Sequence, residues 1–286
     1  MGREVSEALG HEVVVADPNF APMYASRSRK VKTDRRDARA LCEACRLGAY
    51  RPAHRASDES RHRRAQVATR EALVRTRTKF ISLMRALVRR EGYRIRSGGA
   101  ANFAARLAEL ELPEHLREEV APLLTVMETV NEQIKAANRR LEEIVKNDEV
   151  GQRLQSVPSV GPVTVVTFLA TVDRVERFDN AGQVRAYLGL VPREYSSGER
   201  QMRGRITKAG NSRLRYLLVE AAWGILRRPH PETEALRGWT ERIAARRGKR
   251  IAVVALARKL AGILYAMWRD GTRFGEHATP IKRAAA

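Results

Sequence analysis

Aromatic side chains are scarce in this chain, since Phe, Trp and Tyr make up only 6% of its 286 residues. A protein that stacks nucleic-acid bases on aromatic rings needs several such rings on one surface. The scarcity therefore argues against a large base-stacking platform. Hydrophobic residues still reach 43%, so a core can form, and the length suits about two domains.

Cysteine is nearly absent, with Cys42 and Cys45 alone in the sequence. Their Cys-Glu-Ala-Cys spacing supplies half of a four-ligand zinc site, and no second pair completes it. In a helix the two side chains share one face. We therefore expect small core residues here and no metal.

Long apolar runs are missing too, as no stretch reaches the roughly 18 apolar residues of a membrane span. Arg3, Glu4 and Glu7 interrupt the positions where a secretory signal would be apolar. The sequence predicts no membrane span and a cytoplasmic location.

Acidic residues are too few to balance the basic ones, with 33 Asp and Glu against 54 Lys and Arg, a formal net charge of +21. Such an excess repels itself and favours an anionic partner, of which nucleic acid is the commonest. The alternative is the generally basic protein composition of a GC-rich genome.

The first segment, residues 1–60, is typical of a partial α/β unit. Gly10 is expected to end a helix, residues 11–16 form a β-branched run typical of a strand, and a helix is expected from about Asp37 to Cys45.

Residues 61–150 predict two long helices with coiled-coil character. In the first helix, residues 61–91, apolar side chains recur every seven positions at Val67, Val74, Ile81 and Val88. The second carries a longer heptad series: Leu116, Val120, Leu123, Met127, Val130, Ile134, Ala137, Leu141 and Ile144. Pro122 is expected to kink this helix or to start it afresh. The helices can pair as an antiparallel hairpin or dimerise with a second copy.

Residues 151–270 change in texture to short helices with Gly and Pro turns, typical of a separate compact domain. Residues 271–286 are expected to form a tail that is frayed over residues 282–286. Within this domain, the turn at residues 156–165 contains Pro158 and Gly161 between apolar flanks. It resembles the hairpin of helix-hairpin-helix motifs, whose backbone N–H groups, here near Gly161, bind phosphate. The alternative is an ordinary turn between helices.

A second motif covers residues 189–215, where small and basic residues alternate. The candidate nucleic-acid ligands are Arg193, Arg200, Arg203, Arg205, Lys208, Asn211, Arg213 and Arg215. Gly198, Gly204 and Gly210 would allow close backbone approach to a ligand. Ser197 precedes Gly198 in an expected exposed turn, and a hydroxyl beside arginines suits a nucleophile toward a phosphodiester. A loop that grips phosphate without covalent chemistry is the alternative.

A third motif places Asp34 and Asp37 three residues apart, on one face of a helix. Paired carboxylates can bind Mg²⁺ for phosphoryl chemistry. Carboxylates spaced in this way beside Arg also form ordinary solvated ion pairs.

These motifs and their order resemble those of the insertion-sequence transposases related to the Piv DNA invertase. The motifs are Lys-x-Asp-x-x-Asp-Ala, two long helices, Val-Pro-x-Val-Gly-Pro, Gly-Leu-Val-Pro-x-x-x-Ser-Ser-Gly and Ile-Thr-Lys-x-Gly-Asn-x-x-Leu-Arg. The resemblance runs from about Gly10 to about residue 268.

The resemblance implies a RuvC-like (RNase H-like) N-terminal domain with an Asp-Glu-Asp-Asp set that binds Mg²⁺, a coiled coil, and a C-terminal domain with a nucleophilic serine. By motif, Asp34 and Asp37 match the last two carboxylates and Ser197 matches the nucleophile, with Ser196 as the neighbouring candidate. DNA is the implied substrate, and some members are guided by a structured RNA. The heptads and the two-ended nature of recombination favour a dimer or tetramer.

The chain departs from that pattern in one respect, because it opens at the helix that follows the family's first Asp and its Glu. We therefore expect half of the carboxylate set to be absent, through a misassigned start or a decayed gene, and Mg²⁺ to be weakly held or absent in this chain. The sequence predicts an Mg²⁺-dependent DNA recombinase or, as the alternative, a truncated, catalytically inactive nucleic-acid-binding derivative.

Overall fold

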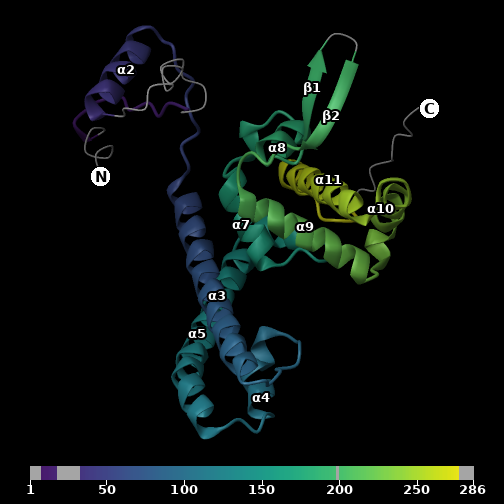
Figure 1. The fold of residues 1–286 in the computed structure, drawn as a ribbon. Coiled ribbons are helices and arrows are strands. Elements are labelled where there is room, and N and C mark those ends of the chain that lie inside the picture. Colours follow the sequence, from purple (N-terminus) through teal and green to yellow (C-terminus); the bar gives the residue numbers. More distant parts are fainter. Residues whose placement is uncertain (1–7, 18–32, 198–199, 277–286) are drawn as a thin grey trace. The chain divides into compact units, whose positions relative to one another are not determined.

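The computed structural model describes residues 8–17, 33–197 and 200–276 of the chain, and the described part is mostly helical (Figure 1). The prediction of a mostly α fold is therefore confirmed. The chain divides into two compact units, residues 1–57 and residues 58–286. The segments 61–150 and 151–270 both lie within the second unit.

The first unit contains helix α2, Asp34–Arg46, where a helix was predicted. The helix begins after Thr33, whose hydroxyl accepts a hydrogen bond from the backbone N–H of Arg36 at 3.4 Å. Asp34 and Asp37 lie in the first turn, where negative charge interacts favourably with the helix dipole.

The prediction of a strand over residues 11–16 is wrong, because these residues do not form a full strand. Only Ala16 pairs, through one antiparallel bridge to Pro52. Two backbone hydrogen bonds hold it, from Asp17 N–H to Arg51 at 2.8 Å and from Ala53 N–H to Val15 at 2.7 Å. A strand needs a paired neighbour along its length, and residues 11–14 have none within the described part of the chain. The RuvC-like architecture of this segment stays a prediction.

Cys42 and Cys45 are exposed, so their prediction as core residues is wrong. The face of α2 that is buried in this small unit carries Ala44, and the two cysteines lie outside it. Both are free thiols.

The second unit begins with a helical hairpin made of α3, Asp58–Arg90, and α5, Glu114–Lys146. A 3₁₀ turn, Ala100–Asn102, and a short helix α4, Phe103–Ala108, cover its distal end. Figure 1 shows α3 and α5 running side by side in opposite directions, with α4 at the closed end.

Side-chain contacts fix the register of this hairpin. Arg70 Nε donates to Asn138 Oδ1 at 2.6 Å, and Arg77 Nη1 donates to Asn131 Oδ1 at 3.3 Å. Later positions on α3 thus contact earlier positions on α5. Of the two predicted arrangements, the contacts match the antiparallel hairpin. The apolar series of both helices faces the seam, and the buried members are Val67, Ile81, Val88, Leu116, Val120, Met127, Val130, Ile134, Ala137 and Leu141.

Pro122 lies inside α5 without starting a new helix, because α5 is continuous from Glu114 to Lys146. Proline lacks the N–H that would bond to the preceding turn. Near the N-terminus of a 33-residue helix, that loss leaves the remaining backbone ladder intact.

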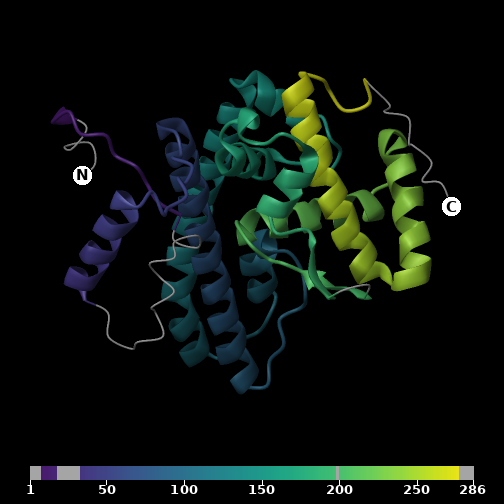
Figure 2. The same cartoon turned by 90° about the horizontal axis from the view of Figure 1, so that it is seen from above.

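The remainder of the second unit is a compact helical domain with one β-hairpin. Its elements are α6 (Glu149–Gln155), α7 (Pro162–Val172), α8 (Ala181–Tyr187), β1 (Pro192–Ser197), β2 (Arg200–Ile206), α9 (Ser212–Arg227), α10 (Glu234–Arg247) and α11 (Lys249–Asp270), with 3₁₀ turns at Val175–Arg177 and Pro231–Thr233. Helices α7, α9 and α11 supply most of the core, which also takes in Val67 and Leu141 from the helical hairpin. Figure 2 shows α10 and α11 side by side.

Helix α11 is the one helix of the described part that is long and apolar enough to cross a membrane, yet 56% of its apolar window is buried within the protein. Leu256, Leu260 and Leu264 are fully buried in the core, so packing accounts for the apolar composition. After α11, the backbone N–H of Phe274 donates to Ser156 at 3.0 Å. The predicted tail is therefore held to the domain as far as that residue, and residues 277–286 lie outside the described residues.

Candidate nucleic-acid interface

The second motif folds as an antiparallel β-hairpin, which the sequence did not predict. Figure 1 shows strands β1 and β2 side by side. In their pairing, Ser197 lies opposite Arg200 and Ser196 lies opposite Gln201. Ser197 is the last residue of β1, and Gly198 lies outside the described residues. The candidate nucleophile thus stands at the distal end of a two-stranded projection.

Basic residues follow this hairpin along both strands. Arg193 on β1 and Arg205 on β2 are exposed, Arg200 and Arg203 also lie on β2, and Lys208 is exposed just after it. The register shifts between Pro192 and Glu194, so the strands carry a bulge where Arg193 lies. Bulges bend a strand and re-aim its side chains. Exposed guanidiniums on a narrow hairpin suit contact with phosphate.

Two glycines lock the base of the hairpin. Gly189 has φ +66 and Gly210 has φ +67, values that favour glycine. A β-carbon on Gly189 would clash with the backbone of Ala209, and one on Gly210 would clash with the carbonyl oxygen of Tyr187. Gly210 therefore lets its own segment pack closely against the backbone at Tyr187. The sequence had suggested close approach to a ligand at this position.

Asn211 is engaged in folding contacts. Its side chain caps α9 by accepting from the N–H of Leu214 at 3.1 Å and donates to Thr171 Oγ1 at 3.0 Å. It thus joins the start of α9 to the end of α7.

Arg215, like Asn211, makes hydrogen bonds within the fold. Its Nη1 donates to the carbonyl oxygens of Leu188 and Gly210 at 3.2 Å each, and to that of Ala209. Burial lowers the pKa of Arg215. This guanidinium draws together the segments on either side of the β-hairpin, so its visible role is to position that hairpin.

Arg213 connects α9 to the helical hairpin. Its Nε lies 3.6 Å from Glu71 Oε2 on α3, and its guanidinium stacks over Tyr216 at 5.3 Å from the ring centroid. Burial lowers the pKa of nearby Arg70, and the positive charges of Arg213 and Arg77 lower it further. A cavity of about 240 Å³ lies here, between α3, α7 and the start of α9.

Gly161 caps α7 without a side-chain bond, at φ −93, and a β-carbon there would meet nothing within 4 Å. The turn between α6 and α7 is packed against α9, where Gly224 lies against the Ser159 side chain. The helix-hairpin-helix role of this turn stays a prediction.

Asp34 and Asp37 share the first turn of α2, with Asp34 exposed and Asp37 partly buried. They belong to the first compact unit, and Ser197 belongs to the second. Within the described residues, no three His, Cys, Asp or Glu side chains gather as a metal-binding group.

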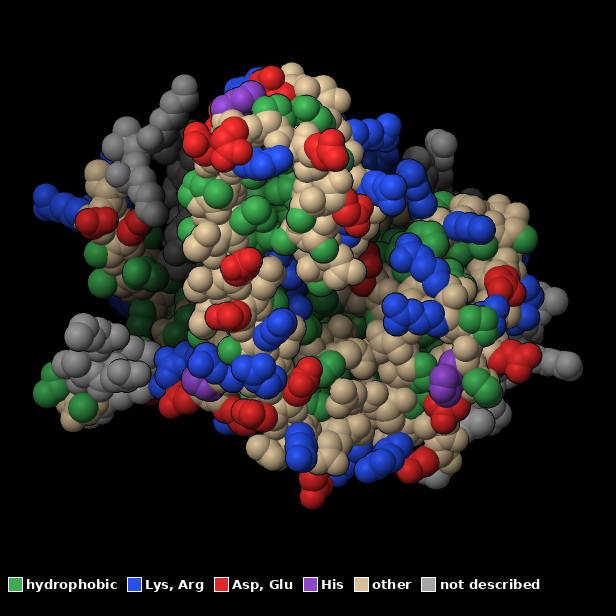
Figure 3. All heavy atoms as spheres, turned by 90° about the horizontal axis from the view of Figure 1, so that it is seen from below, with side chains coloured by type: hydrophobic (Ala, Val, Ile, Leu, Met, Phe, Trp, Pro, Cys, Tyr) green, Lys and Arg blue, Asp and Glu red, His purple; other side chains and the backbone are tan. Residues whose placement is uncertain are grey.

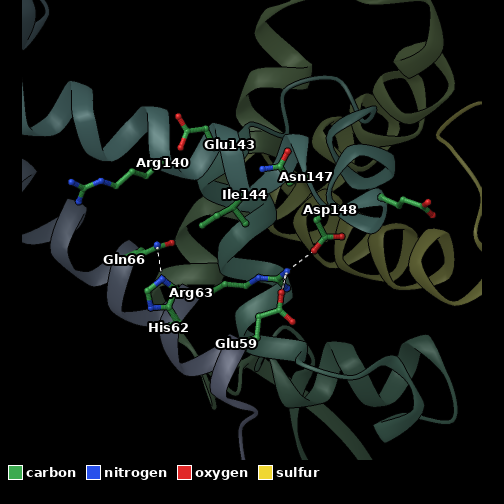
Figure 4. Close-up of a pocket in the computed structure, with 10 residues that line it drawn as sticks. Glu59, His62, Arg63, Gln66, Arg140, Glu143, Ile144, Asn147 and Asp148 are labelled. Carbon is green, nitrogen blue, oxygen red and sulfur yellow. Dashed lines mark hydrogen bonds and ion pairs between the residues drawn. The ribbon is translucent and has the colours of Figure 1, made fainter.

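A hollow of about 630 Å³ lies between the start of α3 and the end of α5 (Figure 4). Arg63 crosses it and pairs with Glu59 and Asp148 at 2.5 Å each. Glu143 and Glu149 also line it. Since carboxylates outnumber basic groups around this hollow, it does not suit a polyanion.

The basic side chains do not form one continuous patch on the face seen in Figure 3, where Lys and Arg are interspersed with Asp and Glu. We therefore consider particular groups of basic residues as candidate interfaces, and the β-hairpin carries the first of them.

Comparison with known proteins defines the class of protein. A family model described as "Transposase IS116/IS110/IS902 family" matches residues 151–237, which contain the β-hairpin and its glycine-locked base. A second model, of DEDD type and described as a transposase of the IS110 kind, matches residues 4–92.

Individual relatives agree with this class. The chain is 34% identical to the transposase for insertion sequence element IS1111A of Coxiella burnetii, over 91% of this chain and 72% of that protein. It is 32% identical to a probable family 20 transposase of Pseudomonas aeruginosa, over 93% and 79% respectively. For the transposase of IS1328 from Yersinia enterocolitica the identity is 30%, over 96% and 82%.

The chain belongs to the IS110/IS116 family of transposases. The assignment to insertion-sequence transposases made from the motifs is confirmed, and the relation to the Piv invertase stays a prediction.

Proposed function

We propose that this protein is an insertion-sequence transposase that binds DNA and exchanges its strands through a nucleophilic serine, Ser197. The observation that carries the proposal is the match of the family model to residues 151–237, in which Ser197 ends a strand that carries exposed Arg193. The net charge of +21 supports a polyanionic substrate.

The serine chemistry would balance within the DNA backbone. The Oγ of Ser197 attacks a phosphorus atom, a P–O bond to a sugar oxygen breaks, and the departing sugar oxygen takes up the proton that the serine loses. Attack by another sugar hydroxyl on the serine phosphodiester then restores the DNA backbone and frees the serine. Arginine guanidiniums on the β-hairpin would stabilise the charge that develops on phosphorus-bound oxygens.

Asp34 and Asp37 are the residues that would hold Mg²⁺. Two carboxylates on one helical turn fit part of the oxygen ligand set that Mg²⁺ requires, with waters completing it. When bound, the ion would neutralise charge on the reacting phosphate. The residues themselves would position it through the first turn of α2.

A structured guide RNA is proposed as a second partner and a dimer or tetramer as the working form, in the cytoplasm. The clearest test of the function is covalent capture. Purified protein is incubated with Mg²⁺ and labelled duplex DNA, with or without RNA transcribed from the element's ends, and denaturing gels are used to detect a protein–DNA adduct.

We expect an adduct that Ser197→Ala abolishes and Ser196→Ala retains. An adduct lost only in Ser196→Ala would move the nucleophile by one residue. A protein that binds DNA with strong salt dependence and forms no adduct would instead be the binding derivative considered above.

A further inference from the structure

Four basic side chains from three helices lie together in the C-terminal domain, on elements that carry none of the motif residues. Arg185 comes from α8, Arg242 from α10, and Arg258 and Lys259 from α11. We refer to them as the α8–α10–α11 cluster. Sequence reasoning missed it, although Arg258 and Lys259 are the only charged residues between Ile251 and Trp268.

The Arg185 guanidinium packs against α11 at Gly262, where the helix carries no side chain. A β-carbon on Gly262 would lie closer than 3.0 Å to the Arg185 guanidinium, so that group rests directly against the helix. Its Nε is buried and has no hydrogen-bond partner among the described residues.

Within the residues that the structure describes, the cluster carries positive charge without an ion pair to a carboxylate. None of the ion pairs found in the described part of the chain involves Arg185, Arg242, Arg258 or Lys259. Burial lowers the pKa of Lys259, and the charges of Arg185 and Arg242 lower it further. Burial likewise lowers the pKa of Arg185, and the positive charge of Arg258 lowers that pKa further. Because like charges are held together here, an anion would relieve their repulsion.

An aromatic ring adjoins the cluster. Lys259 Nζ lies 4.4 Å from the centroid of the Trp239 ring. Trp239 and Arg242 also line an open hollow of about 460 Å³, together with Arg246. Several cations around one aromatic face are the combination that binds the backbone and bases of a polynucleotide.

We propose that the α8–α10–α11 cluster binds backbone phosphates of a nucleic acid. This inference rests on the proposed function, because that function supplies the nucleic acid. Four residues, 188–191, join α8 to β1, so the cluster and the β-hairpin are adjacent along the chain. The cluster would hold the polynucleotide beside the strand that bears Ser197. DNA and RNA share the phosphodiester chemistry that the cluster recognises, and the test has an arm for each.

The experiment measures binding of the full chain to labelled duplex DNA and, separately, to RNA transcribed from the element's ends, across a salt series. The cluster variant is Arg242→Gln with Lys259→Gln. Its matched control is Lys135→Gln with Arg139→Gln, which removes two exposed charges from α5. We expect the slope of log affinity against log salt to become less steep by about 2 in the cluster variant, roughly 1 for each phosphate that is no longer neutralised, with a much smaller change in the control.

A second pair of variants tests the seating of Arg185 without removing charge. Gly262→Ala must displace the flexible guanidinium, whereas Gly238→Ala brings its β-carbon only to 3.8 Å from Arg242. Alanine favours a helix over glycine, so both variants are expected to keep their Tm. We expect Gly262→Ala to weaken binding several-fold and Gly238→Ala to leave it unchanged.

If the cluster variant loses affinity for only one of the two nucleic acids, that nucleic acid is the one that contacts the cluster. A loss of affinity for either DNA or RNA supports the proposal. Equal binding by the cluster variant and its control in both arms would overturn it, while leaving the proposed function intact. A wild-type chain that binds neither DNA nor RNA would overturn both.

Discussion

Gly210 lies directly against the carbonyl oxygen of Tyr187, so closely that a β-carbon at position 210 would come within 3.0 Å of that oxygen. This contact joins the end of α8 to the segment before α9, and the β-hairpin emerges between them. The glycine of the Thr-Lys-x-Gly-Asn motif therefore allows the two segments that flank the β-hairpin to pack closely at its base.

We expect Gly210→Ala to lower the free energy of unfolding by more than about 1 kcal/mol, because it combines a backbone clash with a left-handed conformation that alanine adopts poorly. Urea denaturation measures this. Gly161→Ala is the control, since its β-carbon meets nothing within 4 Å. Equal stability of the two variants would mean that the contact at Tyr187 is not maintained in solution.

Asn211→Ala is expected to cost about 1 kcal/mol of stability through loss of the α9 cap. Asn211→Asp keeps the capping oxygen and removes the N–H that Thr171 accepts. We therefore expect Asp to restore most of the stability that Ala removes. If Asp proved as damaging as Ala, the bond to Thr171 would be the more important one.

Arg63→Gln should destabilise the second unit by about 1–3 kcal/mol, because it breaks two charge-assisted contacts of a side chain that is only 13% exposed. Arg61→Gln is the matched change close by on the same helix. Its pair with Asp58 is largely exposed, so we expect a cost below about 1 kcal/mol. Thermal denaturation of both variants compares them, and equal losses of stability would contradict the expectation.

Arg193→Gln with Arg205→Gln should weaken DNA binding with no change in Tm, because both side chains are exposed on the β-hairpin. The salt dependence should become less steep by about 1 for each phosphate that these side chains would otherwise neutralise. Arg215→Gln serves as the contrast, since it removes hydrogen bonds to three carbonyl groups and should lower the Tm. Unaltered DNA affinity in the double variant would exclude the hairpin cations from the interface.

The sequence by itself determined the long helices and the family. The seven-residue spacing of Val67, Val74, Ile81 and Val88 depends only on helix geometry, and Val67, Ile81 and Val88 are buried. The motif order from residues 32–38 to 204–215 was sufficient for the transposase assignment, which the family models confirm.

Tertiary structure decided which motif residues serve the fold and which remain available to a ligand. Asn211 meets Thr171, and the α8–α10–α11 cluster gathers charges from three helices. Such contacts join residues far apart in the chain, so local periodicity carries no signal of them. The same limit explains the errors at residues 11–16 and at Cys42, because strand pairing and burial depend on neighbours that only the folded chain supplies.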